Sequence, residues 1–278
     1  MTMFTVLGAS GTIGRRLVSR LATAGHEVYA PTRGDPGIHA RPLGHAIYAI
    51  GITADFRTRP LETVEAHVCV LRELIARAEF ESLTYLSSTR VYGGLPADSR
   101  VDEDSALLVN PNAASDLYDL SKLMGESLCL HAGRGTIRAV RLSNVIGADD
   151  PDSQNFLPSL IREARTGTVT LRTAPDSAKD YVHIEDVLTL LPEIATQGRH
   201  RLYNLASGRK ISHREWTYWL AAKTGCRIEV MPNAPRVEFP AIDIGRIRQE
   251  FRFAPRDVLK SVFGGINTDS RLTTPKTQ

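Results

Sequence analysis

The sequence is poor in cysteine, in excess charge of one sign and in long apolar stretches. Its three cysteines, Cys69, Cys129 and Cys226, are odd in number and lie far apart. Neither a disulfide framework nor a closely spaced cysteine metal site is expected. The pair His183 and Asp186 has metal-like spacing but lacks an apparent third ligand. We therefore expect no metal and a reducing, cytoplasmic environment.

The weak charge bias excludes a second class of function. A net charge of +3 with 23% charged residues does not provide the concentrated basic face that nucleic-acid binding requires. No apolar run approaches the roughly 20 residues of a membrane helix. The first expected strand begins at Met3, which leaves no room for a signal peptide. We expect neither nucleic acid nor a membrane as a partner.

What the sequence does contain is an alternation of apolar strand patterns and amphipathic helix patterns over its first half. Continuous apolar runs predict buried parallel strands, and the intervening helices predict right-handed crossovers. The fold class is therefore α/β, a Rossmann-type doubly wound parallel sheet. The expected strands are 3–7, 27–31, 46–53, 83–88 and 136–145, with helices after the first strand and over 61–79 and 113–131.

The regularity loosens after about residue 148. Short helices are expected near 156–166, 213–224, 243–250 and 255–262, with strands at 168–172, 203–207 and 227–231. We predict a dinucleotide-binding domain of residues 1–148 plus about 200–208. Residues 149–199 and 209–266 are expected to form a small C-terminal α+β substrate lobe, and 267–278 a polar tail.

A glycine turn follows the first strand and opens the first helix. Gly8 permits the tight turn, Gly11 lets a pyrophosphate approach the backbone, and Gly14 allows close helix–strand packing. The free N–H groups of the helix then face the phosphates. A glycine-rich turn without a ligand is the alternative. Further cofactor-binding candidates are Ser10, Thr12, Ile13 and Gly51.

The end of the second strand bears on the choice between NAD and NADP. An acidic residue there usually binds the ribose 2′-hydroxyl of NAD. This sequence has Thr32 and Arg33 instead, which suit a 2′-phosphate. NADP(H) is therefore favoured, with NAD(H) as the alternative if Arg33 is only an exposed side chain.

Tyr118 and Lys122 lie four residues apart on an expected helix, so both side chains share one face. A phenol with a pKa near 10 exchanges protons poorly at neutral pH. A neighbouring ammonium group lowers that pKa. The pair is thus a candidate acid/base.

Six stretches occur in order along the chain and together resemble the extended short-chain dehydrogenase/reductase family, of the NAD-dependent epimerase/dehydratase type. They are the glycine turn, YLSSTRVYG (85–93), SDLYDLSKLMGE (115–126), VRLSNVIG (140–147), KDYVHIEDV (179–187) and RLYNLASG (201–208). The resemblance extends to about residue 265. It implies that Ser88 hydrogen-bonds the reacting substrate oxygen, that Tyr118 is the acid/base, and that Lys122 holds the nicotinamide ribose. Ser87 and Thr89 leave a register shift of one residue open.

The resemblance also implies a substrate site. Asn144, Lys179 (where arginine is usual) and Arg236 match positions that contact the diphosphate of nucleotide sugars. Arg90 could meet an acidic group of the substrate. The alternatives are solvated charges and, for Asn144, a hydrogen bond to the backbone.

Two departures from the family pattern carry information. Thr89 and Arg90 stand where sugar-nucleotide 4,6-dehydratases place Asp-Glu, so that elimination is not expected. Only GDPGIHARPLGH (34–45) separates the second strand from the third, where the family normally fits another helix and strand. We expect a sheet shortened by about one edge strand and an exchangeable cofactor.

These observations predict an NAD(P)-dependent reductase of a keto carbon in a nucleotide-linked sugar. The alternatives are an epimerase, a reductase of a non-sugar secondary metabolite, and a catalytically silent NADP-sensing protein. A homodimer is expected through helices 61–79 and 113–131. Leu71, Leu74 and Ile75 suit that interface but could equally face the sheet.

Overall fold

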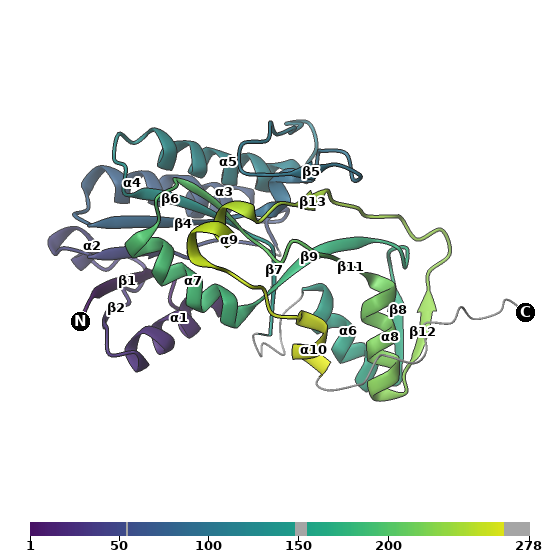
Figure 1. Cartoon of the computed structure of the whole chain (residues 1–278). Coiled ribbons are helices and arrows are strands. Elements are labelled where there is room, and N and C mark those ends of the chain that lie inside the picture. Colours follow the sequence, from purple (N-terminus) through teal and green to yellow (C-terminus); the bar gives the residue numbers. More distant parts are fainter. Residues whose placement is uncertain (54, 148–154, 264–278) are drawn as a thin grey trace, which may run out of the picture.

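A computed structural model describes residues 1–53, 55–147 and 155–263 of the chain. Its centre is a six-stranded sheet in the order β10-β6-β4-β3-β1-β2, parallel throughout (Figure 1). The strands are β1 (Met3–Leu7), β2 (Glu27–Tyr29), β3 (His45–Tyr48), β4 (Ser82–Ser88), β6 (Ile137–Leu142) and β10 (Leu202–Leu205). The predicted doubly wound α/β class is confirmed. The expected tail at 267–278 lies outside the described residues.

Helices cover both faces of this sheet (Figure 1). One layer consists of α1 (Thr12–Thr23) and α7 (Ile184–Gln197). The other consists of α3 (Pro60–Val64), a π-helical turn η1 (Glu65–Cys69), α4 (Val70–Arg77) and α5 (Asp116–His131). Every residue of β6 is buried, which explains why its sequence reads as a strand without polar alternation.

The sheet ends at β2, a strand of only three residues. The segment that follows contains a single helical turn, α2 (Gly37–Ala40), and then enters β3. The predicted loss of one edge strand is therefore confirmed.

The C-terminal lobe is a small α+β unit (Figure 1). Its core lies between two helices, α6 (Phe156–Arg165) and α8 (His213–Thr224), and around Trp216. It also contains α10 (Val258–Phe263) and the parallel pair β8 (Thr168–Leu171) and β12 (Arg227–Val230). Ser212 and Glu215 form a capping box at the start of α8, and Gly225 ends that helix in the left-handed region.

Two further small sheets connect the lobe to the main sheet. One consists of β7 (Asn144–Ile146), β9 (Ala178–His183) and β11 (Lys210–Ser212). The other pairs β5 (Arg100–Val101) with β13 (Ala241–Ile242). The expected strand 136–145 is thus split at Ser143, and its second part belongs to the connecting sheet.

The predicted division of the chain differs from the structure at α7. This helix lies within 149–199, the range expected to form the lobe, but it packs against α1, β3 and β4 of the main sheet. Val187, Leu191 and Ile194 are fully buried there. The helix α9 (Gly245–Phe251) likewise packs beside β10.

Candidate active site at the carboxyl ends of the strands

A cavity of about 1150 Å³ lies where the carboxyl ends of the parallel strands meet the lobe. This is the position at which doubly wound sheets bind their ligands. The predicted site residues that line the cavity are Gly11, Thr12, Ile13, Gly14, Gly51, Ser88, Arg90, Tyr118, Lys122, Asn144 and Lys179. Those that do not line it are Gly8, Ser10, Thr32, Arg33 and Arg236.

The glycine turn joins β1 to α1 at the floor of the cavity. Gly8 has a φ of +87°, and a Cβ there would lie 2.7 Å from the carbonyl carbon of Ala49. A Cβ at Gly14 would overlap the carbonyl oxygen of Gly8. Glycine is therefore required sterically at both positions. Gly11, the N-cap of α1, faces the cavity without such crowding, so its contact with a pyrophosphate stays a prediction.

Ser88, rather than Ser87, is the strand-end hydroxyl that meets Tyr118. The Oγ of Ser88 accepts a hydrogen bond from the N–H of Arg90 at 3.2 Å, and its side chain hydrogen-bonds Tyr118. Ser87 Oγ instead donates to the buried carboxylate of Glu126. The alternating directions of side chains along β4 thus separate the two serines.

Burial sets the protonation of the candidate acid/base pair. It raises the pKa of Tyr118 to about 12, and the hydrogen bond from Ser88 opposes that shift. Burial also lowers the pKa of Lys122 to about 7. The Nζ of Lys122 donates to the carbonyl of Leu86 at 2.9 Å and lies 5.9 Å from the ring centroid of Tyr118. The lower pKa expected from a neighbouring ammonium group is therefore not found: burial outweighs it, and Tyr118 is a neutral phenol.

Three residues predicted to contact the substrate line the same cavity as this pair. Arg90 lies 5.7 Å from the ring centroid of Tyr118, and its Nε lies 3.3 Å from a carboxylate oxygen of Asp119. The amide of Asn144 donates to the carbonyl of Asp180 at 2.8 Å. Lys179 stands over the ring of Phe239 at 5.3 Å, and burial, followed by repulsion from Arg90, lowers its pKa.

Arg236 is not brought to the cavity. Its guanidinium forms ion pairs with Asp176, at 3.0 Å, and with Glu238. Two arginines of α6 that were not predicted as site residues, Arg162 and Arg165, do line the cavity. No sequence motif marks these two arginines, because their approach to the cavity depends on how the lobe packs against the main sheet.

A buried histidine was also missed. His67 lies in the π-helical turn η1 and is fully buried, and its ring is perpendicular to that of Tyr118 with 5.3 Å between the ring centroids. Nothing in the sequence pattern of 61–79 distinguishes a π-turn from a regular helix, so this contact could not be predicted.

The motif residues His183 and Asp186 have structural roles at the start of α7. The Nδ1 of His183 accepts from the N–H of Glu185 at 3.2 Å, and Asp186 pairs with Arg256 at 2.9 Å. Within the described ranges, no group of three metal-ligating side chains occurs, and no helix is both long and apolar enough to cross a membrane.

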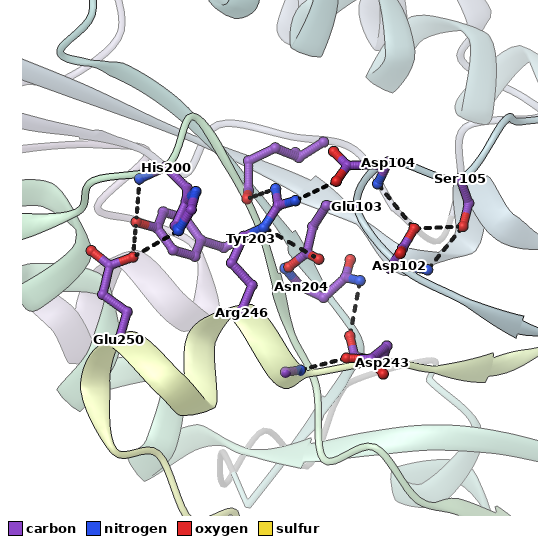
Figure 2. Close-up of polar contacts among 12 residues, drawn as sticks. Asp102, Glu103, Asp104, Ser105, His200, Tyr203, Asn204, Asp243, Arg246 and Glu250 are labelled. Carbon is purple, nitrogen blue, oxygen red and sulfur yellow. Dashed lines mark hydrogen bonds and ion pairs between the residues drawn. The ribbon is translucent and has the colours of Figure 1, made fainter.

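A polar network joins the loop that follows β4 to the C-terminal elements (Figure 2). Glu103 accepts from the N–H of Asn204 at 2.7 Å, and Arg246 of α9 donates to Asp104 at 2.7 Å. Asn204 in turn accepts from the hydroxyl of Tyr92 at 2.8 Å. The segment between Ser88 and Tyr118 is therefore held to β10 and α9 by hydrogen bonds of Tyr92, Glu103 and Asp104.

Comparisons with known proteins agree with this geometry. A model of the NAD dependent epimerase/dehydratase family matches residues 45–206, more than half of the chain. A dTDP-6-deoxy-L-talose 4-dehydrogenase (NAD(P)(+)) of Kitasatospora kifunensis is 25% identical, with 92% of this chain and 91% of that protein aligned.

Solved structures of the same fold cover nearly the whole chain. UDP-glucose 4-epimerase of Thermotoga maritima with UDP-glucose has a TM-score of 0.79 at 18% identity, covering 93% of this chain and 95% of that one. MoeE5 in complex with UDP-glucose and NAD has a TM-score of 0.76 at 22% identity, covering 94% and 96%. RMD from Pseudomonas aeruginosa with NADPH has a TM-score of 0.74 at 22% identity, also covering 94% and 96%.

Proposed function

The chain belongs to the NAD dependent epimerase/dehydratase family and is an NAD(P)-dependent enzyme, and from this premise we propose that it reduces a keto carbon of a nucleotide-linked sugar. The observation that carries the proposal is the convergence of Ser88, Tyr118 and Lys122 with the glycine turn in one cavity. NADP(H) would supply or accept the hydride.

The protonation of Tyr118 supports the reductive direction. A carbonyl oxygen that accepts a hydrogen bond from Ser88 takes its proton from the neutral phenol as hydride arrives at carbon. With a pKa raised to about 12, Tyr118 holds that proton at neutral pH. Oxidation would need the phenolate, so its rate rises with pH, whereas reduction falls only as pH approaches the pKa of the phenol. Lys122 lies close enough to offset the phenolate charge that follows proton transfer.

The charge of the cavity supports an anionic substrate such as a nucleotide diphosphate. Its lobe side carries Arg162, Arg165 and Lys179. Among the described lining residues Asp180 is the one carboxylate, and its two oxygens accept hydrogen bonds from Ser207 at 2.9 and 3.0 Å. Converging cations suit a diphosphate. The relative from Kitasatospora is named for a dTDP-sugar, and the structures of MoeE5 and the Thermotoga epimerase contain UDP-glucose.

A sugar-nucleotide epimerase is the second candidate, because the Thermotoga enzyme shares the fold over nearly its whole length. Incubation with NADPH and a nucleotide-linked 4-keto sugar separates the two. A reductase consumes NADPH in proportion to the product formed, so the absorbance of NADPH falls. An epimerase acting on a nucleotide-linked sugar yields product with no net consumption of NADPH.

We expect Arg33 to select NADPH over NADH. Thr32 and Arg33 are exposed just beyond the short edge strand β2. A guanidinium bond to a 2′-phosphate is charge-assisted, so Arg33→Ser should weaken NADPH binding about tenfold and leave NADH binding unchanged. Isothermal titration calorimetry with both cofactors measures these affinities. The control is Arg41→Ser, because Arg41 is another exposed arginine near that edge of the sheet. Equal losses for both cofactors would contradict the assignment.

We further propose a homodimer through the outer face of α3 and α5. Leu61 and Met124 are 81% and 53% exposed on these helices. Leu71 and Leu74, considered for this interface, are buried against the sheet instead. In analytical ultracentrifugation, Met124→Glu should shift the sedimentation coefficient toward that of a monomer. Met231→Glu is the control and should not, because Met231 is exposed near β12, away from the proposed interface. A monomeric wild-type chain would refute the proposal.

A further inference from the structure

His67 is a buried titratable side chain with no role in the chemistry described so far. It lies in the middle of the π-helical turn η1, between the regular helices α3 and α4, and its side chain is fully buried. A π-turn places one residue out of the α-helical register, and such turns recur at functional sites.

The hydrogen bonds of the ring define its tautomer. The Nε2 of His67 accepts from the backbone N–H of Ile52 at 3.2 Å, so this nitrogen carries no proton. Nδ1 therefore holds the proton and donates to Ser121 Oγ at 2.8 Å. Ser121 Oγ donates in turn to the backbone carbonyl of Tyr118, also at 2.8 Å. Burial, and then repulsion from Lys122, lowers the pKa of His67 to about 3, which keeps the ring neutral.

The same ring lies against the cofactor side of the cavity. A Cβ on Gly51 would lie 3.3 Å from His67 Nε2 and 3.4 Å from Lys122 Nζ, so both nitrogens face the backbone of Gly51. Gly51 and Thr53 line the cavity on either side of Ile52. On the other side, a Cβ on Gly125 would lie 2.9 Å from the carbonyl oxygen of His67, so η1 packs directly on α5.

We propose that His67 is a positioning residue that joins the Gly51–Ile52 backbone to the Tyr118–Ser121 turn of α5. Its acceptor nitrogen holds the loop after β3, against which the cofactor would lie, and its donor nitrogen holds the helix that carries Tyr118 and Lys122. The inference rests on the proposed function only in requiring that NADPH occupies this cavity.

Three substitutions separate the two hydrogen bonds. In His67→Gln the amide oxygen can reach the position of Nε2 and accept from Ile52. In His67→Asn the shorter side chain reaches only the position of Nδ1, and in His67→Phe the ring remains but neither bond forms. Because the part-buried N–H of Ile52 loses its hydrogen-bond partner in the Asn and Phe variants, we expect each to bind NADPH about tenfold more weakly.

The experiment is titration of NADPH into each variant without a sugar substrate, with thermal unfolding as the check on folding. The Gln variant should bind within about threefold of wild type, as should the control His200→Gln, whose half-exposed side chain lies outside the cavity. Unchanged binding in the Asn and Phe variants would overturn the proposal, as would equal losses in all three. If wild type binds no NADPH, the cofactor assignment itself fails.

Discussion

Replacement of Tyr118 by phenylalanine is expected to lower kcat by about 10²- to 10⁴-fold while NADPH binding stays within a few fold of wild type. The substitution removes only the hydroxyl that hydrogen-bonds Ser88. The ring, which is buried and packs against Phe56 and His67, is retained. The loss should therefore appear in the chemical step rather than in stability or cofactor affinity.

Single-turnover rates and NADPH titration together measure this effect. Tyr218→Phe is the matched control, because Tyr218 is 49% exposed on α8 and does not line the cavity. A Tyr118→Phe enzyme that kept more than about a tenth of wild-type turnover would show that another group donates the proton, since general acid catalysis contributes at least about 10²-fold.

Replacement of Arg141 by methionine should destabilise the fold by about 3–5 kcal/mol, the largest effect that we expect on stability. Arg141 Nη2 lies 2.7 Å from a carboxylate oxygen of Glu126, and both side chains are 4% exposed. Nη1 also donates to the hydroxyl of Tyr92 at 2.7 Å. Without the arginine, the buried carboxylate of Glu126 would keep the hydrogen bond from Ser87 but lose its ion pair.

Urea unfolding of Arg141→Met and Arg172→Met tests the role of burial. Arg172 pairs with Glu163 at the same distance of 2.7 Å, but its side chain is 65% exposed. Such an exposed pair contributes about 0–1 kcal/mol. Adding Glu126→Leu to Arg141→Met should recover much of the loss, because the orphaned charge is removed. Similar losses at both arginines would mean that burial does not set the strength of the pair.

The parallel sheet could be predicted because strands such as β1 and β4 are almost wholly buried and therefore appear in the sequence as apolar runs between helix patterns. The order of the strands was not predicted. The glycine turn could be predicted as well. Any side chain at Gly8 or Gly14 would collide with the backbone, so the turn requires glycine at fixed positions that are visible in the sequence. The missing edge strand followed from the resemblance and from length together, because residues 34–45 are too few for the helix and strand that the family normally has there.

Features that depend on contacts between distant segments could not be predicted. The sequence separates α7 from α1, yet their side chains pack on one face of the sheet. The choice between Ser87 and Ser88 required the direction of each side chain, which places Ser87 against Glu126. Arg236 matched a family position but is held by two carboxylates away from the cavity. The position of His67 depends on the π-turn, which shifts the helical register, and no pattern of residues in the sequence indicates such a turn.

The central claim is that hydride moves between NADPH and a carbon of a nucleotide-linked sugar in this cavity. The most direct measurement is the mass of the product after reaction of a nucleotide-linked 4-keto sugar with NADPH that carries deuterium at the transferable position. We predict one deuterium per product molecule, bound to the former carbonyl carbon, and none with Tyr118→Phe on the same timescale. Binding of both ligands by wild type without deuterium in the sugar would contradict the claim.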